Sequence, residues 1–228
     1  SRYEVVIDAA HWHAFSTTSA LVSRWAASRW VIGSQRGPAD IYSRAVPPPA
    51  DGTPEVEAKL DLARALGLHV SAQPMETALG LRTPWPAREP FVALNPGARK
   101  LDHRLPPERF AALARALPLK SVVFWGPGEE ELARKVGAEL APPTNLEQLA
   151  SAFRAARLVV TNDTGPMHLA VACGAPVLAL FKNGAGLRWA HPGPRFRAIV
   201  EPAGDAAVLA AARQLLDTAG GAAEPPSP

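Results

Sequence analysis

Apolar and polar positions along the chain fall into two kinds of block. Short runs rich in β-branched and aromatic residues alternate with stretches of helical periodicity, which is typical of parallel β-α-β units. The predicted strands are Tyr3–Ile7, Phe91–Leu94, Ser121–Trp125, Leu158–Thr161 and Val177–Phe181. Most are almost continuously apolar, as strands covered on both faces are. The pattern therefore predicts an α/β fold with parallel sheets.

Helical spacing recurs throughout the chain. The predicted helices are Ser19–Ala27, Pro54–Leu66, Pro107–Leu117, Glu129–Leu140, Leu146–Ala155, Pro166–Cys173 and Asp205–Leu216. Pro107 and Pro166 suit a first helical turn, and Gly67 and Gly174 suit helix ends.

The chain is predicted to form two units. Residues 73–90 include Pro84-Trp85-Pro86 and show little periodicity, so we expect a linker there. An N-terminal unit over residues 1–72 and a C-terminal unit over 91–217 flank it, and residues 218–228 are expected to be a disordered tail. The N-terminal unit shows one strong strand and two helices, too little for an α/β domain with a covered sheet.

Composition excludes several classes of protein. The 228 residues carry a net charge of +3 with scattered Arg, too weak a signal for nucleic-acid binding. The single cysteine, Cys173, excludes an intramolecular disulfide framework and a cysteine-based zinc site. No apolar run approaches the roughly 18 to 20 residues that span a bilayer, and no signal-peptide pattern opens the chain. We therefore expect a cytoplasmic location.

The most informative segment runs from Leu158 to Phe181: strand, tight turn, short helix, Gly stop, strand. Its turn and first helical residues are Asn162-Asp-Thr-Gly-Pro-Met-His168. Free amides at the start of this helix and the positive end of its dipole form an anion site. Thr164 adds a hydroxyl, and His168 lies four residues later on the same helix face. A phosphate or diphosphate is the natural ligand, although Asp163 or Thr164 serving as a mere helix cap with a packed His168 is an equal alternative.

Two more segments carry candidate ligand-binding residues. The strand from Phe91 leads into a loop whose candidates are Asn95, Gly97, Arg99, Lys100, His103 and Arg104. Its basic side chains would neutralise phosphate oxygens, unless they are simply solvated. Glu129 follows the strand after Ser121, at a place where open α/β sheets hold a ribose hydroxyl. Glu129 would otherwise be an ordinary first-turn acid.

In a parallel sheet the carboxyl ends of the strands share one edge, so the three segments would converge on one crevice. A nucleoside diphosphate fits such a crevice. The sequence has no Walker A loop and no G-x-G-x-x-G fingerprint, and no D-x-D pair or His/Asp cluster suggests a divalent metal. We expect neither a metal nor a cofactor.

These segments resemble glycosyltransferase family 9, the lipopolysaccharide heptosyltransferases, which have two Rossmann-like domains in the GT-B arrangement. The resemblance rests on Asn162–Ala170 with Cys173-Gly-Ala-Pro176, on Asn95–Ala98, on Leu105–Ala111 and on Trp125–Leu132. Tyr3–Ala9 and Ser19–Arg24 also resemble part of the family's acceptor domain, so the likeness covers nearly the whole chain.

The resemblance implies transfer of a sugar, typically heptose from ADP-heptose, to a lipopolysaccharide core or a related lipid-linked glycan, with inversion and without a metal. The resemblance implies that the donor is bound by Asp163, Thr164, Gly165, Pro166, Met167 and His168. Glu129 would bind the ribose of the donor. The other implied donor-binding residues are Asn95, Gly97, Arg99, Lys100 and Arg104. A monomer is the family-like state.

The chain also departs from the family pattern. Leu105 replaces the family's Trp, which leaves the phosphate-neutralising role to Arg104 or Lys100. Asp8-Ala-Ala-His-Trp-His13 interrupts the acceptor motif, and Thr18 replaces its basic residue. The family's opening strand, Gly-rich turn and catalytic Asp would precede Ser1, so we expect an N-terminally incomplete piece rather than a natural short relative. Asp8 is a poor substitute base because an acid after a strand more often caps the next helix.

Two interpretations of function remain. The first is a glycosyltransferase, and the second is a nucleotide-sugar-binding module without catalysis. Trp12, Trp25 and Trp30 lie among Arg24 and Arg29, a pattern that suits contact with the inner face of the inner membrane, although core packing explains large aromatic side chains more often.

Overall fold

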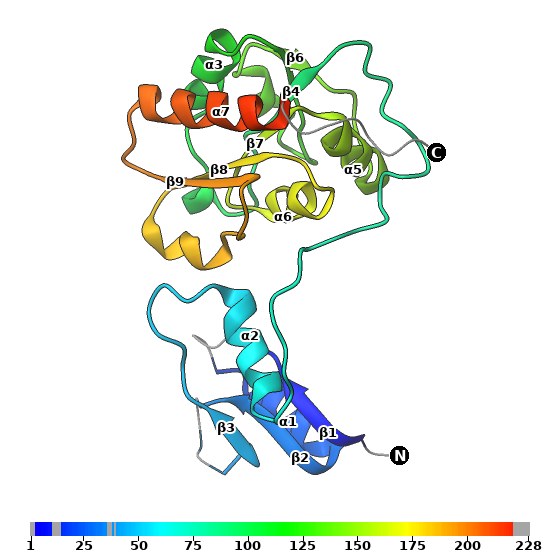
Figure 1. Ribbon diagram of the computed structural model, residues 1–228, viewed down its shortest axis with the longest axis vertical. Coiled ribbons are helices and arrows are strands. Elements are labelled where there is room, and N and C mark those ends of the chain that lie inside the picture. Colours follow the sequence, from blue (N-terminus) through cyan, green and yellow to red (C-terminus); the bar gives the residue numbers. More distant parts are fainter. Residues whose placement is uncertain (1–2, 11–14, 36–37, 39, 221–228) are drawn as a thin grey trace. The chain divides into compact units, whose positions relative to one another are not determined.

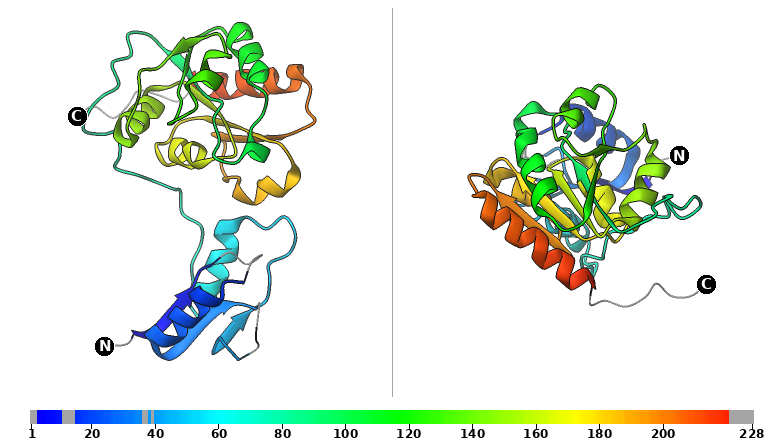
Figure 2. Two further views of the ribbon diagram at one scale, coloured as in Figure 1. Left: turned by 180° about the vertical axis from the view of Figure 1, so that it is seen from behind. Right: turned by 90° about the horizontal axis from the view of Figure 1, so that it is seen from above.

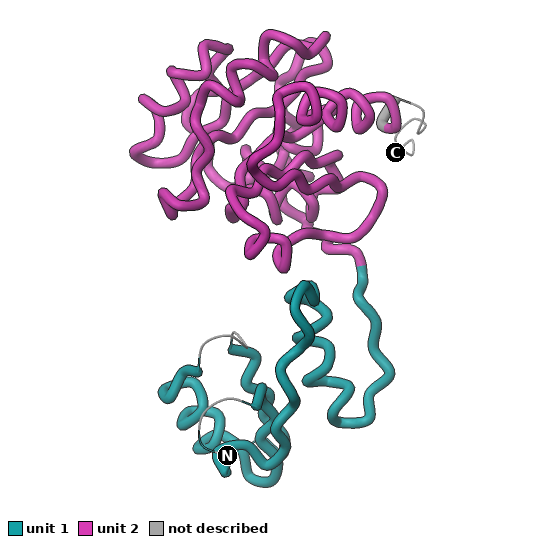
Figure 3. The backbone as a smooth tube through the Cα atoms, turned by 90° about the vertical axis from the view of Figure 1, so that its left-hand side faces the viewer, with its two compact units in different colours: residues 1–73 teal, residues 74–228 magenta. Residues whose placement is uncertain are grey.

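The computed structural model describes residues 3–10, 15–35, 38 and 40–220. The chain forms two compact units, Ser1–Gln73 and Pro74–Pro228 (Figure 3). Each unit is built on a parallel β-sheet, as the alternating sequence pattern predicts.

The first unit holds a three-stranded sheet in the order β1-β2-β3. Its elements are β1 (Tyr3–Asp8), α1 (Thr17–Ala26), β2 (Ala27–Ser34), β3 (Arg44–Val46) and α2 (Glu55–Arg64) (Figure 1). β2 begins at the residue after α1, without a Gly or Pro between them, and this is why the sequence pattern missed β2. The unit therefore contains more sheet than the single predicted strand.

The carboxylate of Asp8, at the end of β1, organises the first unit. Its Oδ1 accepts hydrogen bonds from the Ser19 hydroxyl at 2.6 Å and from the Ala10 amide at 3.1 Å, and its Oδ2 accepts one from the Tyr42 hydroxyl at 2.8 Å. Gly33 leaves room for the Tyr42 ring, which a Cβ at that position would overlap. Asp8 thus links β1, α1 and the segment before β3.

The second unit holds a six-stranded parallel sheet in the order β6-β5-β4-β7-β8-β9. Its strands are β4 (Phe91–Asn95), β5 (Lys120–Val123), β6 (Glu139–Leu140), β7 (Leu158–Asn162), β8 (Val177–Phe181) and β9 (Phe196–Val200). The chain runs outward from β4 in one direction and from β7 in the other. The point between β4 and β7 is therefore the topological switch point, at which open α/β sheets bind ligands.

Helices cover both faces of this sheet (Figures 1 and 2). They are α3 (Pro107–Ala116), α4 (Glu130–Arg134), α5 (Leu146–Ala155), α6 (Gly165–Ala172) and α7 (Asp205–Gly220), with the 3₁₀ turns η1 (Leu101–His103) and η2 (Gly184–Trp189). Alternate residues of β4 belong to two hydrophobic cores, one on each face of the sheet. Phe91 and Ala93 pack with α5 and α6, whereas Val92 and Leu94 pack with α3 and α7. This double burial explains the continuously apolar strands.

The segment after Gln73, expected as part of a linker, packs on the second unit. Arg154 of α5 donates hydrogen bonds to the carbonyls of Leu79 and Thr77, and the Ser151 hydroxyl donates to Thr83. The Trp85 ring lies 5.4 Å from the Phe124 ring, centre to centre. Residues 77–85 therefore form a strap over α5.

Three segments differ from the sequence expectation. The helix expected over Glu129–Leu140 stops at Arg134, because Gly137 adopts a φ of +72°, and the edge strand β6 follows. β9 was missed although Gly193-Pro194 and Pro202 flank it, because Arg197 interrupts its short apolar run. α7 continues to Gly220, past the predicted end at Leu216, and the rest of the expected tail lies outside the described residues.

Cys173, at the end of α6, is a buried free thiol, and burial raises its pKa. Among the described residues, no helix combines the length and apolar character that crossing a membrane requires.

The strap over α5 gives a stability prediction. Replacing Arg154 by Met removes its hydrogen bonds to the strap carbonyls and to Cys173 O, and we expect the second unit to lose about 2 to 3 kcal/mol of unfolding free energy. Arg157→Met is the matched control, because the Arg157 side chain is exposed. Urea denaturation measures the free energy of unfolding of both variants, and hydrogen exchange measures the protection of the amides of residues 77–79. Equal stability of the two would show that the strap does not depend on Arg154.

Candidate functional site

The three predicted segments meet at the carboxyl edge of the second sheet, beside the switch point. Asn162, the last residue of β7, is fully buried, and its side-chain amide reaches two loops. Its Nδ2 donates to Pro96 O at 2.7 Å, and its Oδ1 accepts from the Leu105 amide at 3.3 Å. Asn95, at the end of β4, donates to the Thr161 hydroxyl at 3.3 Å. These bonds bring the loop after β4 against the end of β7.

Glu129 and Gly97 are in direct contact. A Cβ at Gly97 would overlap the Glu129 carboxylate, so the close approach requires glycine. The carboxylate accepts hydrogen bonds from Arg104 at 2.9 Å and from the Gly126 amide at 3.1 Å. Arg104 also donates twice to Ala98 O, at 3.1 and 2.6 Å. Arg104 is thus engaged in holding this loop.

The two other predicted cations of the loop after β4, Arg99 and Lys100, have exposed side chains. The Lys100 ammonium lies near enough to Asp163 to influence that carboxyl electrostatically. Lys100 is therefore better placed than Arg104 to act on a ligand at this edge.

Asp163 lies between β7 and α6 with 8% of its surface exposed. His103 Nδ1 approaches its Oδ2 at 3.1 Å and its backbone oxygen at 3.2 Å. Burial raises the pKa of the Asp163 carboxyl. The charges that act against this rise are those of His103, His168, Arg188 and Lys100. The Asp163 carboxyl therefore lies among basic side chains from several elements.

The first turn of α6 is open to a ligand. Thr164 precedes the helix in an extended conformation, and its side chain makes no capping hydrogen bond. Gly165 is exposed, and a Cβ there would meet no atom within 4 Å. Pro166 has no N–H and the Met167 amide donates to Thr164 O at 3.0 Å, so the Gly165 amide is the first-turn donor that is oriented toward an incoming anion. Pro166 is half-buried, whereas the Met167 side chain is buried in the core, where it packs instead of facing a ligand.

His168 pairs with a histidine that the sequence analysis missed. His168 Nδ1 lies 2.7 Å from Nε2 of His191, which belongs to the loop between η2 and β9. Burial lowers the pKa of His168, and the charge of Asp163 opposes this shift. Burial, together with the neighbouring His168, lowers the pKa of His191 to about 4. Sequence spacing gives no signal for this pair, because 23 positions separate its members.

A small cavity of about 180 Å³ lies beside Asp163 and is lined by His103, Lys182, Arg188 and Trp189, among others. Gly186 allows the close approach of this wall, because its Cβ would stand 3.0 Å from Asp163 Oδ2. Asp102 lines the cavity as well, and the mixture of basic side chains, two carboxylates and an indole suits a group that is rich in hydroxyls.

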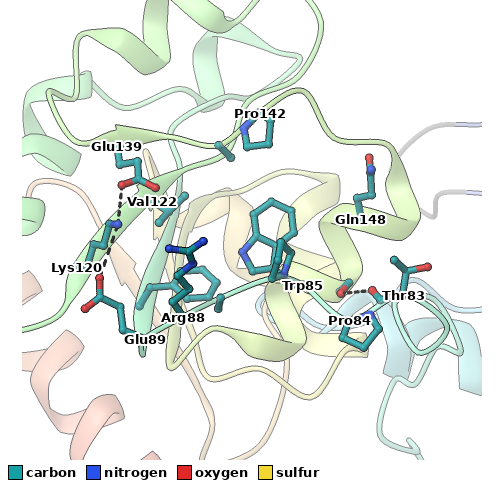
Figure 4. Close-up of a pocket in the computed structure, with 15 residues that line it drawn as sticks. Thr83, Pro84, Trp85, Arg88, Glu89, Lys120, Val122, Glu139, Pro142 and Gln148 are labelled. Carbon is teal, nitrogen blue, oxygen red and sulfur yellow. Dashed lines mark hydrogen bonds and ion pairs between the residues drawn. The ribbon is translucent and has the colours of Figure 1, made fainter.

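A second cavity, of about 640 Å³, lies elsewhere (Figure 4). It is lined by Phe91, Lys120 and Glu139, the first residues of β4, β5 and β6, and by Trp85 and Pro142. Lys120 pairs there with Glu139 at 2.7 Å and with Glu89 at 3.7 Å. This cavity therefore contains none of the predicted donor-binding residues, which lie beyond the opposite ends of the strands.

Asp8 belongs to the first unit, and its exposed fraction is 4%. Three donors occupy its carboxylate, so Asp8 has a structural role. Within the described part of the chain, no three His, Cys, Asp or Glu side chains are grouped to bind a metal ion.

Comparison with known proteins gives one family and several solved structures. The model of glycosyltransferase family 9 (heptosyltransferase) matches residues 1–210. The Escherichia coli heptosyltransferase WaaC with ADP is 22% identical, with a TM-score of 0.71 over 96% of this chain and 73% of WaaC. No match was found among the curated proteins.

Two more solved structures have the same fold. The family 9 glycosyl transferase from Veillonella parvula is 17% identical with a TM-score of 0.73, covering 96% of this chain and 75% of its own. The Escherichia coli ADP-heptose lps heptosyltransferase II is 21% identical with a TM-score of 0.66, covering 95% and 77%. These likenesses confirm the predicted fold class, α/β of the GT-B type with parallel sheets.

The contact between Gly97 and Glu129 gives a second prediction. Gly97→Ala places a methyl group against the Glu129 carboxylate, and overpacking of this kind costs about 1 to 3 kcal/mol. We expect thermal unfolding of the second unit at a lower temperature. The double variant Gly97→Ala/Glu129→Ala removes the overlap and should recover part of the loss. Equal melting of Gly97→Ala and the unmodified protein would contradict the contact.

Proposed function

Because the chain belongs to glycosyltransferase family 9, the heptosyltransferase family, we propose that it transfers heptose from ADP-heptose to a lipopolysaccharide core or a related lipid-linked glycan. The proposed reaction inverts the anomeric centre and uses no metal ion. The observation that carries the proposal is the open first turn of α6, with Gly165 exposed and His168 and Asp163 beside it.

The geometry supports a diphosphate at α6. An anion there would meet the Gly165 amide, the Thr164 hydroxyl and the positive end of the helix dipole. Lys100 adds a mobile cation from the loop after β4. In the proposed site these groups neutralise the diphosphate charge, as a divalent metal ion does in other nucleotide sites. WaaC, the structural neighbour described above, was solved with ADP, which supports the same kind of donor here.

In the proposed reaction an acceptor hydroxyl attacks the anomeric carbon and gives up its proton to a general base, and the bond from that carbon to the diphosphate oxygen breaks. Negative charge then develops on the departing ADP. Preorganised amide donors stabilise such charge more in the transition state than in the ground state, which lowers the barrier. The helix end and Lys100 would supply this stabilisation.

Glu129 is proposed to bind the nucleoside ribose. Its carboxylate is held against Gly97 by Arg104 and the Gly126 amide, so its position is fixed before the donor arrives. A carboxylate accepts from the two ribose hydroxyls, and a fixed one loses little entropy on binding.

A nucleotide-sugar-binding module without catalysis is the second candidate. The hydrogen-bonded carboxylate of Asp8 favours it, because three donors of its own unit hold this carboxylate and weaken it as a base for the proton of the acceptor hydroxyl. The two candidates share the donor site and differ in whether sugar is transferred.

We further propose that a monomer acts at the cytoplasmic face of the inner membrane. On α1, Trp25 is 74% exposed, and Leu21 and Val22 are each 57% exposed. Together with Arg24 and Arg29, this surface suits an anionic bilayer that carries the acceptor. Trp12, also suggested for this contact, lies outside the described residues.

Calorimetric titration with ADP, UDP and GDP tests the donor site. We expect binding selective for ADP and unchanged by magnesium, since the chain's own groups neutralise the diphosphate. Equal affinity for the three nucleotides would contradict the proposed donor, and dependence on magnesium would contradict metal-independent binding. Release of ADP from ADP-heptose with an acceptor then separates a transferase from a binding module.

Gly165→Ala tests whether the ligand approaches this backbone. The new methyl group meets no protein atom within 4 Å, so thermal stability should stay the same. It would stand where the diphosphate approaches, and we expect ADP to bind about tenfold more weakly, or about 1.4 kcal/mol. Unchanged ADP affinity with unchanged stability would place the ligand elsewhere.

A further inference from the structure

We propose that His191 is a positioning residue for His168: it donates a hydrogen bond to His168 Nδ1, so that the opposite nitrogen, Nε2, carries the hydrogen that contacts the donor diphosphate. This inference rests on the proposed donor site. It assigns a role to a residue that belongs to none of the three motif segments.

The contact is short and well supported. The two ring nitrogens lie 2.7 Å apart, a distance at which one hydrogen must lie between them. The His191 ring stacks edge-to-face on Phe196, with centres 5.5 Å apart, and on His168, at 4.9 Å. His191 is therefore held between the first strand residue of β9 and the ligand-facing end of α6.

The loop that carries His191 is anchored at both ends. The Ala190 amide donates to Leu187 O at 2.9 Å, the Phe196 amide donates to Gly193 O at 3.3 Å, and the Val177 amide donates to Arg195 O at 2.8 Å. A positioning residue needs such support, because a loose partner would not restrict the ring that it contacts.

Hydrogen-bond chemistry selects one arrangement of the shared hydrogen. Diphosphate oxygens accept hydrogen bonds and do not donate them, so His168 must present an N–H at Nε2. A neutral imidazole carries one hydrogen, and Nδ1 of His168 must then be bare. His191 supplies the missing hydrogen from its own Nε2. The tautomer of His168 is thus set by the second ring, as a hydrogen-bond partner on the other ring nitrogen sets the tautomer of a metal-bound histidine.

The same pair can take up one proton when the diphosphate arrives. The proton adds at His191 Nδ1, and the shared hydrogen moves from His191 Nε2 to His168 Nδ1. The positive charge then lies on His168, next to the ligand, and His191 accepts the hydrogen bond through its bare Nε2. No other reactant is needed.

The charged groups near the pair allow this uptake. Asp163, from the turn before α6, is the charged group that acts on His168, and Arg188, His103 and Lys100 act in turn on Asp163. On α5, Glu147 and Arg154 act on Cys173, at the other end of α6. Burial lowers the pKa of both histidines, so they are neutral near pH 7 in the empty site, and the negative ligand raises the pKa of His168. ADP affinity should therefore rise as the pH falls toward the pKa of His168 in the complex.

Two substitutions separate this role from packing. His191→Phe keeps an aromatic ring against Phe196 and removes both nitrogens. His191→Gln places an amide near the position of Nε2 and can donate the same hydrogen bond. We expect His191→Phe to weaken ADP binding about tenfold and to abolish proton uptake, measured by calorimetry of the full chain in buffers of different ionisation enthalpy. His191→Gln should stay within about threefold of the unmodified protein, because it restores the donor to Nδ1.

A double-substitution cycle completes the test. His168→Phe should weaken ADP binding about as much as His191→Phe does. The double variant should lose no more ADP affinity than either single variant, because the two rings act as a unit. Additive losses, or a His191→Phe protein that binds ADP and takes up protons normally, would overturn the positioning role. If His168→Phe leaves ADP affinity intact, the donor site itself is wrong and the proposed function fails first.

Nitrogen-15 NMR of the histidine rings gives a readout that needs no nucleotide. We expect His168 in the Nε2–H form in the unmodified protein and in His191→Gln, and a mixture of both tautomers in His191→Phe. A bare Nε2 on His168 in the unmodified protein would refute the proposal, whether or not ADP binds.

Discussion

The hydrogen bonds of one buried amide, that of Asn162, determine how the carboxyl edge of the second sheet is built. The side chain satisfies a carbonyl in the loop after β4 and an amide just before α3, and neither group has another strand to pair with. A hydrophobic residue here would leave two buried polar groups unpaired, at a cost of about 1 to 3 kcal/mol each. The positions of Gly97, Lys100 and His103 follow from this link, because all three lie on the segment that it ties to β7.

Electrostatics at this edge follow from which charges are paired within the protein. Arg104 and Glu129 neutralise each other and fix the loop. Asp163 is paired with His103, and burial raises the pKa of its carboxyl. The Gly165 amide and the Lys100 side chain are then left for a ligand, which explains how a site that contains carboxylates can still attract an anion.

The sequence predicted more of the second unit than of the first, for physical reasons. Strands buried on both faces are recognisable from composition alone, and this applies to β4, β7 and β8. β2 and β6 were missed because the first follows a helix without a break and the second has two residues. The motif residues around Asp163 do lie together, since one turn of chain holds them. His191 could not be predicted, because its partner is reached only through the folding of η2 and the loop before β9. The pairing of Arg104 with Glu129 likewise depends on a contact between residues 25 positions apart.

The contact between Gly97 and the Glu129 carboxylate has a consequence for how this protein can vary. Any side chain at position 97 conflicts with an acid at position 129, whereas an Ala at position 129 would make room for it. A larger residue at position 97 therefore requires either loss of the acid or movement of its carboxylate away from Arg104 and the Gly126 amide. As long as the acid is needed in this place, glycine is favoured at position 97, although it has no side chain with which to contact a ligand.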